Sequence, residues 1–236
     1  KTPVNVVLGY TDMFRDGLLG TLTPIQEKAI ETVARQSREL QRLIGGVLQV
    51  SHLEAETLRA DTREIHLWEF VSEIRSACEP LQDKELRLVW DCPADLPAVR
   101  TDEGKLKLML VNLIDNAIKF SERGTITVSM RYLISKKVLE IKVADTGSGI
   151  PADEITAIFE KFHQAQGVKT AGQRRGVGLG LYTVKKYADF LGGTVQVESR
   201  AGSGSTFTLR IPVMAHRPTS AHEQMPLLAG AEVHEG

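Results

Sequence analysis

The chain has 236 residues, of which 42% are hydrophobic and 25% charged, a composition that is typical of globular proteins and excludes a largely disordered chain. Its formal net charge of −1 excludes strong bulk attraction to nucleic acid or to an anionic membrane. The sequence contains no run of about 18 apolar residues and no secretory signal pattern. We interpret Cys78 and Cys92 as packed thiols in a reducing compartment, and therefore expect a cytoplasmic location without membrane contact.

The first 58 residues are predicted to form two helices joined by a short turn. Thr23, Pro24 and Gln26 give the second helix a strong start signal, as N-cap, first helical residue and capping-box partner. The helix then carries a coiled-coil seam with alternating spacings of three and four, formed by Ile30, Val33, Ser37, Leu40, Ile44, Val47 and Ser51. A glycine pair at 45–46 is expected to weaken it. A lone hairpin cannot cover its own apolar stripes, so a dimeric four-helix bundle is favoured over packing onto the same chain.

A change of composition near 60–63 predicts a linker, after which strand and helix patterns follow each other. Alternating apolar residues predict five strands, and helical spacing predicts three main helices, so we expect one sheet covered on one face. The strands are expected around 86–90, 126–132, 139–145, 195–197 and 207–211, and the helices around 67–81, 106–120 and 177–191. The segment 91–98 is predicted as a loop, and the chain from Ala215 to the end as a disordered tail.

The helix predicted at 106–120 carries a second, polar stripe beside its apolar one. The apolar stripe consists of Leu106, Leu110, Leu113 and Ala117, and the polar stripe of Asn112, Asp115, Asn116 and Lys119. The polar stripe is either a solvated helix face or the wall of a ligand site. Amide and carboxylate oxygens suit a hard cation and a lysine suits a phosphate, so the sequence favours the ligand site.

An aspartate and two groups of glycines follow further along the chain. Asp145 ends a predicted strand on its buried side and precedes Gly147 and Gly149, an arrangement that fits a purine amine and a flat ring or, alternatively, a solvent-facing Asp-Gly turn. The glycines at 176, 178 and 180 lead directly into a helix, where backbone N–H groups could bind phosphate; the alternative is a turn with a tight helix–sheet contact. The sequence GSGSTF at 202–207 is interpreted as an ordinary hairpin turn, and the phenylalanines at 159 and 162 as core residues.

In their order, these motifs resemble the N, G1, F, G2 and G3 boxes of sensor histidine kinases. The matching motifs are Asn112-x-x-x-Asn116, Asp145-x-Gly147-x-Gly149, Phe159-x-x-Phe162, Gly176-x-Gly178-x-Gly180 and Gly202-x-Gly204. The resemblance covers about residues 1–213 and implies an α+β protein. Its parts would be a dimerisation and histidine phosphotransfer hairpin (1–60), a two-layer α/β sandwich ATP-binding domain of the gyrase–Hsp90–histidine kinase–MutL type (61–214) and the tail (215–236).

The same resemblance implies the site residues and the cofactors, ATP and Mg²⁺. Asn112 would help to hold Mg²⁺, Asn116 and Lys119 would approach the phosphates, and Asp145 would pair with the adenine amine. The loop between Phe162 and Gly176 would be the lid over ATP. The ATP-binding set is completed by Phe120, Gly147, Gly149, Ile150, Phe162, Arg175, Gly176, Val177, Gly178, Leu179, Gly180, Leu181 and Thr206.

The phosphoacceptor motif of the family, close to H-E-x-[KR]-T-P, is present only in part. The chain opens on Lys1, Thr2 and Pro3, so the acceptor His would lie three residues before Lys1. We therefore expect a kinase core from a longer protein, cut just after its acceptor and unable to phosphorylate itself, whose parent could be membrane-bound. The resemblance gives Thr2 a role in orienting water for dephosphorylation. The expected partners are a second copy, through residues 1–58, and a response regulator receiver domain; the alternative function is a non-catalytic dimeric nucleotide-binding scaffold that docks a regulator.

Overall fold

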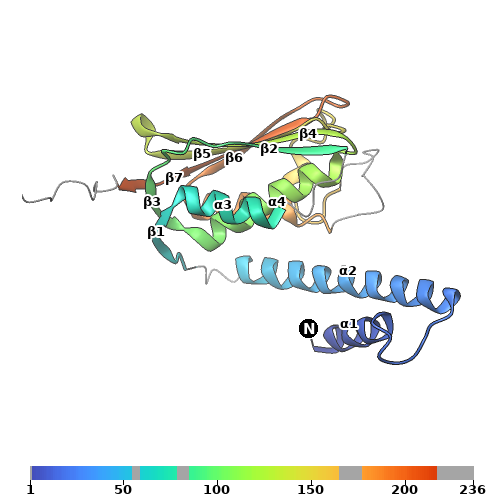
Figure 1. Ribbon diagram of the computed structural model, residues 1–236. Helices are drawn as coiled ribbons and strands as arrows, with labels where there is room; N and C mark the ends of the chain where they lie inside the picture. Colours follow the sequence, from blue (N-terminus) through green and yellow to red (C-terminus); the bar gives the residue numbers. More distant parts are fainter. Residues whose placement is uncertain (1, 55–58, 79–84, 165–176, 217–236) are drawn as a thin grey trace, which may run out of the picture.

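The computed structural model describes residues 2–54, 59–78, 85–164 and 177–216. Helices α1 (Thr2–Arg15) and α2 (Pro24–Glu54) form an antiparallel hairpin that lies beside a two-layer body (Figure 1). The predicted capping box is confirmed, since the backbone N–H of Thr23 donates to Gln26 Oε1 at 2.9 Å and the N–H of Gln26 donates to Thr23 Oγ1 at 3.4 Å. Helix α2 continues through the glycine pair at 45–46 without a break.

The two helices of the hairpin contact each other through polar pairs and little buried apolar surface. Gln41 Nε2 donates to Asn5 Oδ1 at 2.8 Å, and an Arg38 nitrogen lies 3.8 Å from an oxygen of Asp12. Buried hydrophobic residues in the described part of the hairpin are few, and the clearest are Val4 and Ala34. The two helices therefore cover each other only partly.

The body is built on a five-stranded sheet whose strands coincide with those predicted. The strand order is β2-β4-β5-β7-β6; the β2–β4 pair is parallel and the other neighbours are antiparallel. The strands are β2 (Leu86–Asp91), β4 (Gly124–Leu133), β5 (Val138–Asp145), β6 (Thr194–Ser199) and β7 (Ser205–Pro212). The short 3₁₀ turns are η2 (Ile134–Lys136) and η3 (Ala157–Phe159).

Three helices cover one face of this sheet, as Figure 1 shows: α3 (Leu67–Cys78), α4 (Glu103–Phe120) and α5 (Gly180–Phe190). Alternate strand residues point toward them, so Val128, Ile141 and Leu209 are completely buried. The apolar stripe of α4 faces the same layer, and Leu106 and Leu110 are also completely buried. The core thus lies between the helices and the sheet, with α4 at its centre.

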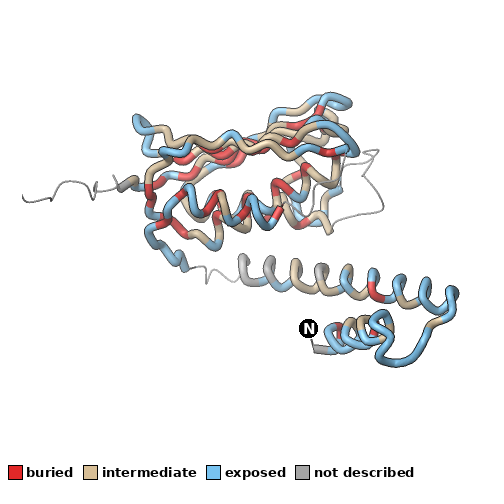
Figure 2. Tube along the Cα trace, in the orientation of Figure 1, coloured by how far each residue is buried: buried red, intermediate tan, exposed pale blue. Residues whose placement is uncertain are grey.

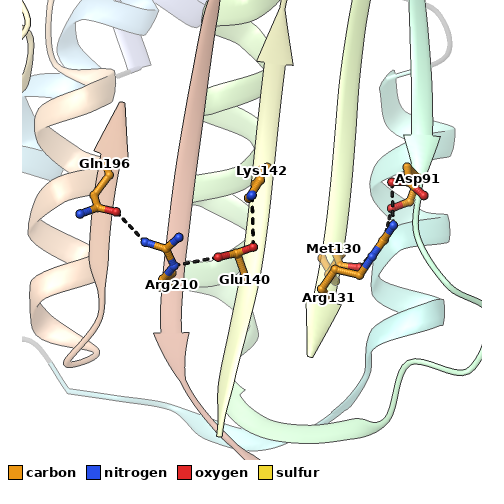
Figure 3. Close-up of polar contacts among 7 residues, drawn as sticks. All are labelled: Asp91, Met130, Arg131, Glu140, Lys142, Gln196 and Arg210. Atoms are coloured by element: carbon orange, nitrogen blue, oxygen red, sulfur yellow. Dashed lines mark hydrogen bonds and ion pairs between the residues drawn. The ribbon is translucent and has the colours of Figure 1, made fainter. Parts of the chain in front are cut away.

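The other face of the sheet is polar and needs no cover. Arg210 Nε donates to Glu140 Oε2 at 2.7 Å, and an Arg210 terminal nitrogen donates to Gln196 Oε1 (Figure 3). Arg131 forms an ion pair with Asp91 at 2.7 Å on the edge side. Burial alone would raise the pKa of Glu140, but the hydrogen bond and charge of Arg210 outweigh it and lower that pKa. These cross-strand pairs explain why the helices lie on one side only.

A second, three-stranded antiparallel sheet was not predicted. Its order is β1-β3-β8, formed by β1 (Thr62–His66), β3 (Ala98–Asp102) and β8 (Met214–His216). The loop predicted at 91–98 is confirmed for residues 92–97, but the strand β3 that follows it was not predicted. The linker predicted at 60–63 runs into β1, and the predicted tail is wrong at its first residues, from Ala215, which belong to β8. Strands of three to five residues are too short to show an alternation of their own. Residues 217–236 of the predicted tail lie outside the described residues.

Within the described part of the chain, no helix is both long enough and apolar enough to span a membrane.

Candidate functional site

The polar stripe of α4 meets the start of α5. Asn112 Nδ2 donates to the Leu108 carbonyl oxygen of its own helix at 2.8 Å, which leaves its Oδ1 directed toward Gly180. A Cβ atom built on Gly180 would lie 2.9 Å from this oxygen and 3.9 Å from Asn116 Nδ2. Glycine therefore allows the first turn of α5 to approach both amides. Asp115, the carboxylate of the stripe, is exposed to solvent.

Asp145 ends β5 in a half-buried position and is held by backbone donors. The N–H of Gly147 donates to Asp145 Oδ1 at 2.8 Å. Burial raises the pKa of Asp145, and the hydrogen bonds from the backbone N–H groups of Gly147 and Ser205 offset this only in part. Gly204 has a φ of +87°, and a Cβ atom there would lie 2.0 Å from the Asp145 carbonyl oxygen. The GSGSTF segment is thus a hairpin turn, as interpreted, but one that packs directly on the Asp145 backbone.

The segment after Asp145 touches the end of α4. A Cβ atom on Gly147 would lie 2.3 Å from the Phe120 carbonyl oxygen and 2.6 Å from Ser121 Oγ. The N–H of Ser148 donates to the same carbonyl at 3.0 Å. Among the described residues, the hydroxyl oxygens of Ser121 and Ser148 are buried without a hydrogen-bond partner. These hydroxyls belong to the packed junction between the end of α4 and the segment that follows Asp145.

The same segment is tied to the β6–β7 hairpin on its other side. Gly149 has a φ of +65°, and a Cβ atom on it would lie 2.0 Å from the Arg200 carbonyl oxygen. The N–H of Ile150 donates to Ser199 Oγ at 2.8 Å, while the Ile150 side chain packs against the core. The N–H of Gly202 donates to the Ser148 carbonyl oxygen at 2.7 Å. These contacts fix the loop that follows Asp145.

Phe162 lies against the glycines that precede α5. Its N–H donates to the Gly178 carbonyl oxygen at 2.9 Å, and a Cβ atom on Gly178 would lie 2.5 Å from the His163 carbonyl oxygen. The predicted burial of Phe162 is wrong, because 59% of the residue is exposed, whereas Phe159 packs against the core as expected. Glu154 Oε2 lies 2.5 Å from His163 Nε2 and holds this segment in place.

The apolar residues next to the glycines at 178 and 180 belong to two separate clusters. Leu181 packs against the main core, whereas Val177, Leu179 and Tyr182 form a small separate cluster. This small cluster contacts the hairpin, since a Cβ atom on Gly46 of α2 would lie 3.1 Å from Leu179 Cδ1. Gly46 therefore has a packing role that its position in the heptads did not indicate, whereas a Cβ atom on Gly45 would meet nothing within 4 Å.

Lys119 lies at the end of the polar stripe, close to the hairpin. Its Nζ sits 4.8 Å from the centre of the Phe120 ring. Burial lowers the pKa of Lys119, and the negative charges of Asp115 and of Glu39, on α2, act in the opposite direction. A lysine that is half-buried and near the two amides is suited to bind an anion.

Thr206 is a predicted site residue that the structure does not bring to the others. It pairs with Ala144 and alternates with the buried Phe207, so it lies on the outer face of the sheet. Ser205 was not predicted as a site residue. It is buried and pairs with Asp145 across the sheet, and its backbone N–H donates to the Asp145 carboxylate. The alternation with Phe207 could have identified Ser205.

Three other predicted positions are not characterised by the structure. Arg175 and Gly176 lie outside the described residues, as does the side chain of Thr2, which is the first residue of α1. Two close approaches join the predicted motifs to α4: Gly180 lies against Asn112 and Asn116, and Gly147 lies against the end of the helix at Phe120.

Two family models match this chain. Residues 101–215 match the family of histidine kinase-, DNA gyrase B- and HSP90-like ATPases, and residues 1–56 match the His Kinase A (phospho-acceptor) domain. Among curated relatives, the aerobic respiration control sensor protein ArcB of Escherichia coli (strain K12) is 32% identical over 94% of this chain and 28% of its own length. The adaptive-response sensory kinase SasA of Synechococcus elongatus is 34% identical over 75% of this chain and 46% of its own length.

A solved structure is also similar to this chain. The crystal structure of full-length ShkA in complex with AMPPNP matches with a TM-score of 0.75 and 28% identity, over 92% of this chain and 44% of that chain. The chain thus spans less than half the length of these relatives. The α+β architecture and the two-domain arrangement of helical hairpin and ATPase-type sandwich are those of the matched families.

Proposed function

The chain belongs to the sensor histidine kinase family, and we propose on that basis that it is an ATP-dependent protein histidine kinase core. It would bind Mg–ATP at the site described above and donate the γ-phosphoryl group to a histidine on the helical hairpin. The phosphoryl group would then pass to an aspartate of a response regulator receiver domain. The observation that carries the proposal is the contact of Gly180 with both Asn112 and Asn116, because it joins the predicted metal and phosphate ligands to a helix start.

The donor set fits a magnesium-bound triphosphate. Mg²⁺ prefers oxygen ligands and commonly combines one or two protein oxygens with substrate phosphates. The Oδ1 atom of Asn112 is available for this role, because its Nδ2 is occupied by Leu108. In the described ranges, no group of three or more His, Cys, Asp or Glu side chains could hold a metal. Bound Mg²⁺ would neutralise phosphate charge, while Asn116 and Lys119 would bind the phosphates.

The surroundings of Asp145 fit an adenine ring. Its carboxylate would accept a hydrogen bond from the exocyclic amine, and Gly147 and Gly149 would let the backbone approach the ring. We include Ser205 in this group in place of Thr206, since it lies beside Asp145.

Catalysis would depend on positioning and charge neutralisation rather than on a covalent nucleophile in the sandwich. The attacking group is a neutral imidazole nitrogen, which forms a bond to the γ-phosphorus while ADP leaves, and its proton needs an acceptor nearby. No histidine of the sequence as given stands in the H-E-x-[KR]-T-P context, so we propose that this chain does not phosphorylate itself. Thr2 would assist a phosphatase reaction toward the regulator by orienting water. We further propose a homodimer through residues 1–58.

Two measurements test the proposal. Isothermal titration calorimetry should detect binding of Mg–ATP to the chain and at least tenfold weaker binding to Asn116→Asp, which places a carboxylate beside the phosphates. Extension of the chain at its N-terminus by His-Glu-Leu would complete the motif, and the extended chain should acquire acid-labile phosphate from ATP. The chain without the extension is the matched control and should acquire none. Nucleotide binding without transfer in the extended chain would instead favour the regulator-docking scaffold, and absence of binding would refute the site.

A further inference from the structure

Asp102 joins three parts of the molecule through one carboxylate. It is the last residue of β3 and the N-cap of α4, where its Oδ1 accepts from the Lys105 N–H at 2.9 Å. Its Oδ2 accepts from the backbone N–H of Asp61 at 2.9 Å. Asp61 belongs to the short segment through which the chain passes from the hairpin to β1 (Figure 1).

Lys105 completes this junction. Its Nζ lies 2.6 Å from Asp102 Oδ2 and donates to the Arg59 carbonyl oxygen at 2.9 Å. The ammonium also lies 5.4 Å from the Phe190 ring centre and 5.9 Å from that of Tyr187, at the end of α5. The Asp102 and Lys105 side chains are 4% and 15% exposed. The pair is therefore largely removed from water and directed at the backbone of residues 59–61.

Helix capping alone does not require this arrangement. One carboxylate oxygen caps α4, whereas the second accepts from the Asp61 N–H and from the Lys105 ammonium, which also donates to the Arg59 carbonyl oxygen. Burial of an ion pair is costly and often no better for stability than apolar packing, so the contribution of this pair is better sought in the specific geometry that it imposes. Burial alone would raise the pKa of Asp102, but the Lys105 and Asp61 donors outweigh it and keep the carboxylate ionised.

Asp102 and Lys105 lie at the start of α4, the same helix that carries Asn112 and Asn116 of the candidate site. Lys105 lies on α4 about two turns before Asn112, and one helix connects the two positions rigidly. At the Lys105 end α4 meets the end of α5, and at the Asn112 end it meets the start of α5 at Gly180. Movement of residues 59–61 is thereby coupled to a rigid pair of helices rather than to a loop.

We propose that Asp102 and Lys105 form a clamp that fixes the segment leaving the hairpin, Arg59–Asp61, to the first turn of α4, and so sets the position of the nucleotide site relative to the hairpin. Both are positioning residues, because neither touches the nucleotide site. Release of the clamp lengthens the tether between the two domains. The effective concentration of a tethered group falls with about the 3/2 power of tether length, so transfer to the hairpin should slow while nucleotide binding is unchanged. This kinetic consequence rests on the proposed kinase function; the clamp itself does not.

The first experiment measures the clamp without any enzymatic activity. Hydrogen exchange of the Asp61 amide should be roughly tenfold faster or more in Asp102→Asn, which removes the charge of the oxygen that accepts from this amide. It should also be faster in Lys105→Met, which removes the ammonium that holds this oxygen and the Arg59 carbonyl oxygen. Lys105→Met keeps an apolar stem over the two rings, and Lys105→Arg should restore slow exchange. The matched control is Lys107→Met, two residues after Lys105 on α4. It removes the ion pair of Lys107 with Glu73 and should leave the exchange rate of the Asp61 amide unchanged.

The second experiment uses the chain extended by His-Glu-Leu. The kcat for phosphorylation of the added histidine should fall about two- to threefold in Lys105→Met, with an unchanged KM for ATP, and should recover in Lys105→Arg. A purely structural role would instead weaken nucleotide binding and lower the unfolding temperature in parallel. Unchanged Asp61 exchange in both clamp variants, or a rise in KM without a fall in kcat, would overturn the proposal. If the extended wild-type chain transfers no phosphate, the proposed function fails, while the exchange experiment still decides on the clamp.

Discussion

The hairpin and the sandwich differ sharply in how they bury their apolar residues. In the sandwich, the apolar stripe of α4 and the inward residues of the central strands are buried (Figure 2). In the hairpin, large apolar side chains remain exposed along both helices, among them Val6, Tyr10, Met13, Val33, Leu40 and Leu48. The sandwich therefore has a complete core of its own, whereas the hairpin has apolar surface that a second copy could cover. Truncation of one leucine in each region should separate the two cases.

The largest effect is expected in the sandwich core. Leu110→Ala removes a completely buried side chain from α4 and leaves a cavity, so the free energy of unfolding should fall by about 3 kcal/mol. Urea denaturation followed by circular dichroism would measure this loss. Because the core lies within one chain, the loss should be the same at all protein concentrations. A concentration-dependent loss would show that the sandwich core is shared between copies.

The equivalent change in the hairpin should act on association instead. Leu40 is 48% exposed in the single chain and belongs to the predicted seam. Leu40→Ala removes one apolar side chain from each copy of the proposed dimer, so the dissociation constant should rise by roughly 30-fold, or about 2 kcal/mol for the pair. Analytical ultracentrifugation would measure it. Glu31→Ala, at an exposed position of the same helix, is a suitable control, and an equal effect of both changes would argue against the seam.

A smaller effect is expected where the two motifs of the site touch. The Cβ atom of Gly180→Ala would press on Asn112 Oδ1 from 2.9 Å, so Mg–ATP affinity should fall about tenfold, or ~1.4 kcal/mol. Alanine is the better helix former, so stability should not fall with it. Gly104→Ala is the matched control in the first turn of α4, where the nearest atom would lie 3.6 Å away. Calorimetry and thermal unfolding would separate binding from stability, and unaltered affinity would exclude this contact from the site.

The sequence predicted the features that depend on short-range patterns. The Thr23 capping box and the five alternating strands are local signals, and the structure confirms them. The strands β1, β3 and β8 are too short for such a signal and form only because the fold pairs Thr62 with Asp102 and Met214 with Arg100. Their prediction would require knowledge of the tertiary arrangement.

The candidate site shows the same division. The order of the glycine and asparagine motifs was sufficient to select residues that the structure joins, such as Asn116 and Gly180. The roles of Gly46 and of Asp102 come from contacts between distant segments, so no spacing in the sequence indicated them. Ser205, not Thr206, lies on the same side of its strand as Phe207 and pairs with Asp145, so the alternation along this strand carried a signal that the choice of Thr206 did not use.

The smallest expected effect concerns the pH dependence of nucleotide binding at Asp145. Burial raises the pKa of this carboxyl above its ordinary value of 3.8, so it takes up a proton at a higher pH than in the unfolded chain. In the free protein this favours folding as the pH falls through the raised pKa. Nucleotide binding should respond in the opposite direction, because an ionised carboxylate accepts the hydrogen bond of the adenine amine more strongly than a protonated one. Affinity for ADP, measured by calorimetry, should therefore fall by about threefold as the pH is lowered through this pKa. Asp145→Asn should bind more weakly at neutral pH and lose this part of the pH dependence, while the titration of the phosphates remains in both proteins; an identical pH profile in the two would exclude Asp145 from the adenine site.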